Sequence, residues 1–200
     1  MSAHAQHHRN GRTIAAMLVL VASFLVGTDC AAAWRAEADV EVPSYAVTEP
    51  ASSNLNIDSV VLMCEAAGDA NVLQLKLYLT DDGPLRPDGV AAERLKADPR
   101  AEISIDGQLF PVSILFADEY AVLADGEHGY FPRLSDDLLD AMASGKRMLV
   151  RFDLAAEPPG QAATFDGAAV IELGSPAIAA VRRCARPPAA PAGSMAFVGH

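Results

Sequence analysis

Residues 72–79 read Val-Leu-Gln-Leu-Lys-Leu-Tyr-Leu, and this stretch decides the fold class. Leucine occupies alternate positions, with Gln, Lys and Tyr between them. A period of two places successive side chains on opposite faces of a strand, so the pattern predicts a half-buried β-strand rather than a helix. Asp81-Asp82-Gly83-Pro84 follows, and this turn sequence predicts the end of the strand.

Further strand signals lie on both sides of this stretch. Residues 60–64 form a short apolar run that ends at Cys64. Residues 101–105 and 109–116 flank Asp106-Gly107. An Asp-Gly pair between two apolar runs predicts a β-hairpin, because both positions tolerate positive φ. More strands are expected over residues 119–124, 146–154 and 168–173.

Two short helices are predicted in the C-terminal half. Ser135 is a favourable N-cap, acidic residues occupy the first turn after it, and Gly145 can end the helix. Ser175 and Pro176 are the cap and first position of a second helix, which ends at Cys184. We therefore expect a mainly β domain, a β-sandwich or a curled antiparallel sheet, with two short α-helices at an edge and thus at the margin of the α+β class.

Residues 1–33 have the organisation of a signal peptide. Arg9 and Arg12 precede an uncharged apolar run over residues 13–27, and Ala31-Ala32-Ala33 follows it. A positive start, a short apolar core and a small-residue site are typical of secretory signals, so we expect cleavage after Ala33. The run is shorter than the roughly 20 residues that span a bilayer, and an uncleaved anchor is the alternative.

A lipid anchor on Cys30 is a further alternative, disfavoured because Asp29 rather than a small neutral residue precedes the cysteine. The expected location is the periplasm or the exterior, with no stable membrane span after cleavage. The mature chain would carry 13 basic and 25 acidic residues, a net charge of −12. Such a charge repels nucleic acids and anionic lipid surfaces, and it favours cationic partners.

Two cysteines, Cys64 and Cys184, remain after removal of the signal peptide. An even pair in an exported protein predicts a disulfide, with two separate buried thiols as the alternative. The bond would join the predicted strand over residues 60–64 to the last predicted helix. The chain contains no Cys-x-x-Cys pair, so thiol redox catalysis and a structural zinc site lack support.

One β-rich domain is expected over residues 58–186. Residues 34–57, which Pro43 and Pro50 punctuate, are expected to form an extended leader with room for one edge strand. Residues 187–200 are rich in Pro, Ala and Gly and are expected to form a disordered tail.

The predicted domain contains one histidine, His128, so a histidine-dependent hydrolase would have to use it, together with Asp125 or Glu127. An exposed loop histidine is the alternative. No common nucleotide-binding, zinc-protease or serine-hydrolase motif occurs in the sequence. We therefore expect neither enzymatic activity nor a cofactor.

Acidic residues next to glycines give a weak calcium signal. Asp81, Asp82 and Asp88 lie near Gly83 and Gly89. The segment lacks the alternating ligand spacing and the closing glutamate of an EF-hand loop. A solvated loop is the alternative to a metal site.

The order of several short segments gives a family resemblance. LQLKLYL (73–79) is followed by ISIDGQ (103–108), LSDDLLDAMASGKRMLVRFDL (134–154) and IELGSPAIAAVRRC (171–184). Over about residues 58–184 the chain resembles the small periplasmic β-sandwich proteins of the invasion-associated locus B family, although it has no cysteines between Cys64 and Cys184. The resemblance implies a periplasmic or surface-associated, non-enzymatic role, with no catalytic residues to transfer.

These observations favour an exported accessory or interaction protein that holds another cell-envelope protein through a sheet face or an edge strand. One alternative is a periplasmic protein that binds a small molecule or a cation such as calcium. The other is a hydrolase that uses His128.

Overall fold

The computed structural model describes residues 33–80 and 83–185. The expected signal peptide, apart from Ala33, and the expected tail lie outside these residues, as do Asp81 and Asp82. Neither of the two α-helices in the described part is long and apolar enough to cross a bilayer.

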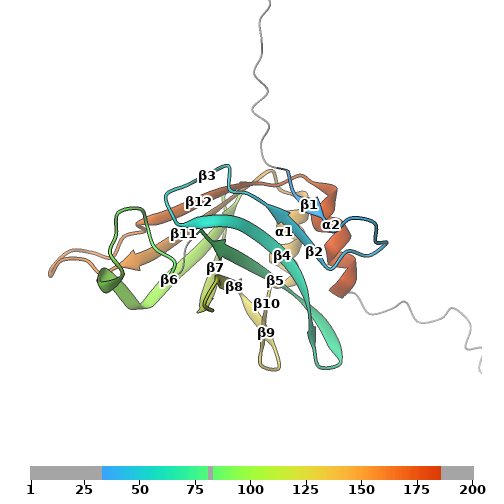
Figure 1. Cartoon of the computed structure of the whole chain (residues 1–200), viewed down its shortest axis with the longest axis horizontal. Coiled ribbons are helices and arrows are strands. Elements are labelled where there is room, and N and C mark those ends of the chain that lie inside the picture. The colour runs from blue at the N-terminus through green and yellow to red at the C-terminus, as the bar shows by residue number, and fades with distance from the viewer. Residues whose placement is uncertain (1–32, 81–82, 186–200) are drawn as a thin grey trace, which may run out of the picture.

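Ten strands form one antiparallel sheet that curls into half a barrel (Figure 1). Their order across the sheet is β1-β2-β4-β5-β8-β7-β6-β11-β12-β3, and a separate hairpin joins β9 to β10. The bounds are β1 Arg35–Ala36, β2 Tyr45–Thr48, β3 Ser52–Ser53, β4 Ile57–Ala67, β5 Ala70–Leu79, β6 Leu95–Ile105, β7 Gln108–Phe116, β8 Tyr120–Ala124, β9 Gly126–His128, β10 Phe131–Arg133, β11 Arg147–Ala155 and β12 Gly167–Glu172. The helices are α1 Asp136–Ser144 and α2 Pro176–Arg182, with 3-10 turns η1 Ala92–Arg94 and η2 Arg183–Ala185. The predicted mainly β fold with two short helices is confirmed, in its curled-sheet form.

Strand β7 connects the two halves of the curl. Its residues 108–112 pair with β6, and its residues 113–116 pair with β8. We call β1, β2, β4, β5, β8 and residues 113–116 the β4 half. We call β6, β11, β12, β3 and residues 108–112 the β11 half.

The hydrophobic core lies on the sheet face that carries Leu73, Leu75 and Leu77, which we call the inner face. These three leucines of the predicted alternation are buried, and the fourth, Leu79, is partly buried against the core. The two helices pack against each other and pack their apolar sides into this core, with Met142 of α1 and Ile178 of α2 buried completely. The opposite sheet face, the outer face, points away from this core.

The local signals in the sequence give the expected structures. The β6–β7 hairpin turns at Asp106 and Gly107, which have φ values of 48° and 94°. Ser135 accepts a hydrogen bond from the backbone N–H of Leu138, as an N-cap does, and Ser175 caps α2 in a similar way. Serine caps thus mark where both helices begin, and acidic residues in the first turn support α1.

Cys64 of β4 and Cys184 next to α2 form a disulfide with their Cα atoms 6.3 Å apart. Asn71 Nδ2 donates a hydrogen bond of 3.1 Å to the backbone oxygen of Cys184, which places η2 against β5. The terminal helix is therefore attached to the β4 half by a covalent bond and by polar contacts.

Residues 34–57, expected as an extended leader, contribute β1, β2 and β3 to the sheet. Trp34 is 4% exposed, and its indole N–H donates to the backbone oxygen of Glu172 over 3.0 Å. The two-residue strands at the sheet edges are too short for any periodic pattern in the sequence, and their pairing depends on partners far along the chain. The structure therefore assigns more order to this segment than its composition indicates.

Candidate binding face

The structure places the two candidate hydrolase residues in different roles. His128 lies at the end of β9 with 46% of its side chain exposed, and its Nε2 is 3.7 Å from Asp69 Oδ1. The Asp125 carboxylate instead accepts hydrogen bonds from the backbone N–H and the hydroxyl of Ser135. Asp125 thus orients the residue that caps α1, and His128 has an exposed carboxylate as its partner.

The candidate calcium residues are only partly within the described ranges. The backbone N–H of Asp88 donates to Asn54 over 2.8 Å, at the rim of an open hollow of about 350 Å³ that Asn56 and Arg86 also line. Within residues 33–80 and 83–185, no group of three or more His, Cys, Asp or Glu side chains could hold a metal ion.

The outer face of the β4 half is apolar. One row of directly paired residues crosses this half from β1 to β7: the exposed Arg35, then Val47, Val61, Lys76, Val122 and Leu115. Paired residues share a sheet face, so the neighbouring pairs Tyr45–Met63 and Tyr78–Tyr120 extend this row on both sides. We call the outer-facing set the apolar face: Tyr45, Val47, Val61, Met63, Lys76, Tyr78, Leu115, Tyr120 and Val122. Its central members Val61, Lys76 and Val122 are buried, so the accessible part of the face is formed by the exposed Tyr45 and Leu115 and by partly exposed neighbours.

Lys76, at the centre of the apolar face, does not break its apolar character. Only 7% of its side chain is exposed. The ammonium donates to Glu65 Oε1 at 2.5 Å and lies 4.9 Å from the ring centroid of Tyr120. The charge is therefore paired and covered, and the aliphatic stem adds to the apolar surface.

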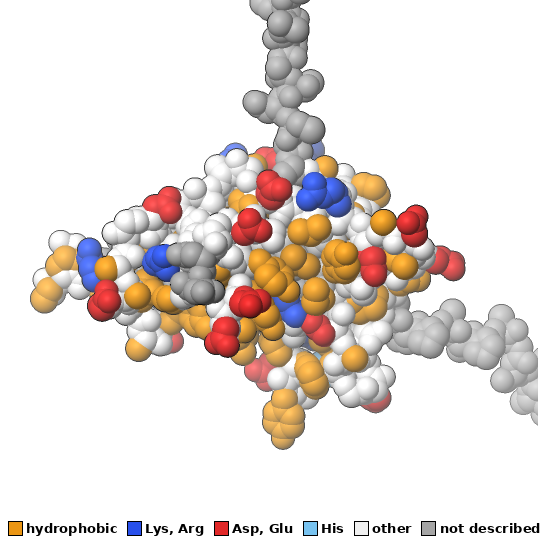
Figure 2. All heavy atoms as spheres, viewed as in Figure 1, with side chains coloured by type: hydrophobic (Ala, Val, Ile, Leu, Met, Phe, Trp, Pro, Cys, Tyr) orange, Lys and Arg blue, Asp and Glu red, His pale blue; other side chains and the backbone are white. Residues whose placement is uncertain are grey.

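Figure 2 shows hydrophobic side chains gathered over β2, β4 and β5, with acidic side chains around them. An open hollow of about 280 Å³ is lined by Tyr45, Val47, Ser59, Val61, Met63 and Tyr78. A second open hollow of about 370 Å³ lies where the outer side of β7 and β8 meets the β9–β10 hairpin, beside Leu115 and Tyr130. Tyr130 at the turn of this hairpin is fully exposed.

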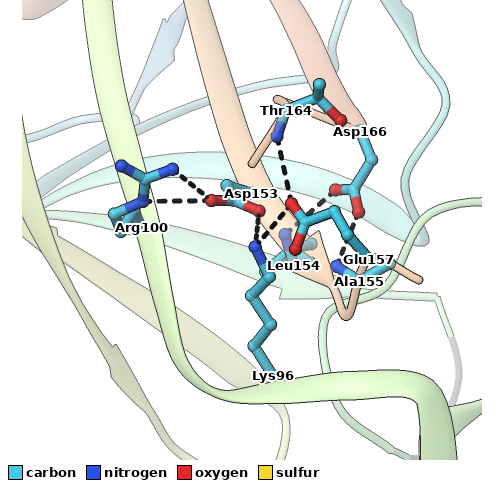
Figure 3. A network of polar contacts seen from close by, with 8 residues as sticks. All are labelled: Lys96, Arg100, Asp153, Leu154, Ala155, Glu157, Thr164 and Asp166. Carbon is cyan, nitrogen blue, oxygen red and sulfur yellow. Dashed lines mark hydrogen bonds and ion pairs between the residues drawn. The ribbon is translucent and has the colours of Figure 1, made fainter. Parts of the chain in front are cut away.

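The outer face of the β11 half is different, because it carries groups of ion pairs, one of them drawn in Figure 3, beside apolar residues such as Leu109 and Leu149. Asp153, 1% exposed, is hydrogen-bonded to both Lys96 and Arg100, and Lys96 also reaches Glu157 at 2.8 Å. Burial alone would raise the pKa of Asp153, but the hydrogen bonds from these two cations outweigh it and lower the pKa. Arg151 and Glu102, directly paired across β11 and β6, form another ion pair on this face.

Both edges of the sheet are short. The edge strands β1 and β3 have two residues each. Next to β3, the backbone N–H groups of Ala51 and Asn54 donate to backbone oxygens of β12. The Asn54 side chain accepts from the backbone N–H of Ala168 and donates to the backbone oxygen of Asp166. An added strand would therefore find few unpaired backbone groups along the adjoining strands.

Comparison of the sequence with protein-family models and with curated proteins, and of the fold with solved structures, gives no match. The fold and the face together define an antiparallel half-barrel with one ion-paired and one apolar outer surface. The resemblance to the invasion-associated locus B family stays a prediction.

The apolar face has a signal in the sequence of β4, which the alternating pattern of β5 does not contain. In β4, residues 60–63 read Val-Val-Leu-Met, so both parities of the strand are apolar. Such a run indicates a strand with two apolar faces. Val60 and Leu62 fill the core, and Val61 and Met63 lie on the outer face.

Proposed function

We propose that this chain is an exported, non-catalytic accessory protein of the cell envelope that binds another envelope protein through the apolar face. The observation that carries the proposal is the contrast between the two halves of one sheet. The outer side of β6 and β11 carries ion pairs among its other side chains, as suits a surface in water. The β4 half presents valine, methionine, leucine and tyrosine on the same side. Apolar side chains gathered on a surface mark interaction sites.

The sheet face is a better candidate than a sheet edge for this binding. Strand addition requires a row of free backbone donors and acceptors along an edge. The short β1 and β3 and the contacts of Asn54 leave little of such a row in the described part of the chain. Tyr130 and Leu115, both exposed, add the kind of large side chain that contributes most to binding energy.

Export is the second part of the proposal and comes from the sequence alone. The signal-like segment and the even pair of cysteines support a periplasmic or extracellular location. Cleavage after Ala33 would leave Trp34 and all other buried core residues of the described part in the mature chain. The test is the N-terminal sequence of the protein from the periplasmic fraction, which we expect to begin at or within a few residues of Trp34. A full-length chain in the cytosol would reject export.

Site-specific photo-crosslinking in living cells tests the binding face. A photoreactive phenylalanine derivative replaces Tyr45 on the apolar face, and the control replaces Phe165, in the loop before β12, whose ring centroid lies 4.7 Å from the Arg151 guanidinium. The two aromatic rings are matched in exposure, at 37% and 41%. We expect a discrete protein adduct from position 45 and none from position 165. Equal adducts from both positions, or none from position 45, would reject the apolar face as the binding surface.

The cation-binding and hydrolase alternatives stay predictions. Calorimetric titration with calcium checks the first, and the phenotype of His128→Ala checks the second.

A further inference from the structure

We infer that the partner segment bound by the apolar face is a basic amphipathic helix of another protein, lying across the strands. This inference rests on the proposed function and adds the shape and the charge of the partner. Three properties of the face carry it: its width across the strands, its depth along them, and the charge around it.

The width of the face fits a short helix. The row from Val47 to Leu115 crosses five strands, which are separated by four inter-strand spacings. At about 4.8 Å per spacing, the row is about 19 Å wide. A helix rises 1.5 Å per residue, so about 13 residues, between three and four turns, cover this width.

The depth of the face fits the diameter of a helix rather than of a strand. Along β4, the outer-facing residues Ser59, Val61 and Met63 form three successive levels of the face. Two steps of two residues at about 3.3 Å each give a depth of about 13 Å. A helix with side chains is about 10–12 Å across and covers all three levels. One extended strand, which occupies about 5 Å in a sheet, would leave two of them in water.

The charge around the face requires cations on the partner. Residues 35–36, 44–80 and 113–133, which carry the face and its margins, contain eight acidic residues and three basic ones, Arg35 at the β1 end of the row, Lys76 and Arg133. Glu65 is neutralised by Lys76, and Asp125 is bonded to Ser135. The other six acids are all exposed: Glu49, Asp58, Asp69, Asp118, Glu119 and Glu127. Glu127 also lines the hollow beside Leu115.

This charge also separates the basic helix from other occupants. A second copy of the chain would bring the same six acids against the face, and the whole chain carries a net charge of −11. An anionic lipid surface would be repelled in the same way. On such a helix, lysine or arginine would pair with the acidic residues, and the apolar stripe beside them would pack on the apolar face.

The test uses the exported chain and three synthetic fluorescent peptides of 18 residues. The first is an amphipathic helix of Leu and Lys, the second has Glu at every Lys position, and the third is a scrambled sequence with the composition of the first. Fluorescence anisotropy measures the affinity for each. We expect the Leu–Lys helix to bind at least about tenfold more tightly than the other two. Equal affinity for the Lys and Glu peptides, or for the scrambled peptide, would overturn the inference.

A matched pair of variants locates the binding. Leu115→Gln lies on the apolar face, and Leu109→Gln lies on the same side of β7 in the β11 half, with the two leucines 43% and 58% exposed. We expect Leu115→Gln to weaken binding of the Leu–Lys helix by about tenfold and Leu109→Gln to leave it unchanged. Equal effects of both variants would overturn the inference. Glu127→Gln is expected to lower the salt dependence of the affinity.

Other occupants give distinct outcomes, and each would overturn the inference. Binding to vesicles that contain anionic phospholipid would identify a membrane surface. A dimer that Leu115→Gln dissociates would identify a second copy of the chain. A photo-crosslink from position 115 to residues 186–200 would identify the chain's own C-terminal segment. If the cellular adduct from position 45 persists while the peptides show no preference, the proposed function holds and the basic helix is wrong.

Discussion

Removal of the Cys64–Cys184 disulfide should lower the free energy of unfolding of this chain more than the loss of any single hydrogen bond or cap. The bond closes a loop over a sequence separation of 120 residues, which includes the strands from β5 to β12 and both helices. In the chain-entropy model, closing a loop of this length removes about 16 cal/mol/K from the unfolded state, which corresponds to about 5 kcal/mol at 25 °C. The side chains themselves add little, because neither cysteine is fully buried.

The assay is equilibrium unfolding in urea, compared between the native chain and Cys64→Ala, Cys184→Ala and the double variant. We expect each variant to lose about 3–5 kcal/mol and the double variant to lose no more than either single variant, because one bond is lost in all three. The slope of the transition should increase, since the unfolded chain without the bond exposes more surface. The native chain under a reducing agent is the control and should match the variants.

A loss of less than about 1 kcal/mol in all three variants would refute this reasoning. It would mean that the unfolded chain stays compact without the bond. A double variant much less stable than both single variants would also refute it, because the cysteine side chains would then contribute through packing rather than through the cross-link.

Three further changes test particular contacts. The lowered pKa of Asp153 means that this group stabilises the fold above the pKa of an unfolded aspartate, about 3.9, and that the contribution is lost as the pH falls through the folded pKa. Asp153→Asn should therefore lower the free energy of unfolding by about 1–3 kcal/mol at pH 7 and by less as the pH falls toward 2, as measured by urea unfolding at both pH values. Gly145→Ala would place a Cβ 2.5 Å from Ile105 Cγ2 and 2.7 Å from the backbone oxygen of the preceding helical turn, so we expect a loss of about 1–3 kcal/mol in the same assay at pH 7. Asp125→Ala removes the carboxylate that holds the Ser135 cap and should cost about 1 kcal/mol, with a reduced helical signal in circular dichroism; unchanged stability would show that Ser135 caps α1 without this support.

Local signals in the sequence account for much of the fold. The alternation over residues 72–79, the Asp106-Gly107 turn and the Ser135 and Ser175 caps each depend on near neighbours in the chain. Their predicted elements are present at those positions in the structure. The pairing of Cys64 with Cys184 was predictable because the exported chain was expected to keep only these two cysteines.

The curl of the sheet and the roles of the polar residues depend on contacts between distant residues. Whether β7 pairs with one neighbour or divides itself between β6 and β8 is decided by register, which leaves no periodic trace in residues 108–116. The same limit applies to the candidate site. Asp125 and His128 are three positions apart in the sequence, yet Asp125 bonds Ser135 and His128 faces Asp69.

The apolar face could be predicted from the sequence only in part. Val61 and Met63 in β4 were visible in the sequence as apolar residues, but strand periodicity does not say what covers each face. That distinction required the positions of α1 and α2, which pack on the core side of the sheet. The ion-paired side of β11 was equally hidden, since Lys96 and Asp153 are far apart in the chain.

The short edge strands β1 and β3 affect how readily this protein aggregates at high concentration. A sheet with an apolar surface can associate edge to edge with identical molecules and form fibrils. This association propagates through the unpaired backbone N–H and C=O groups of the edge strands. In this chain each edge strand has only two residues, which is too short to propagate such pairing. The two short edge strands therefore disfavour edge-to-edge association while leaving the apolar face accessible.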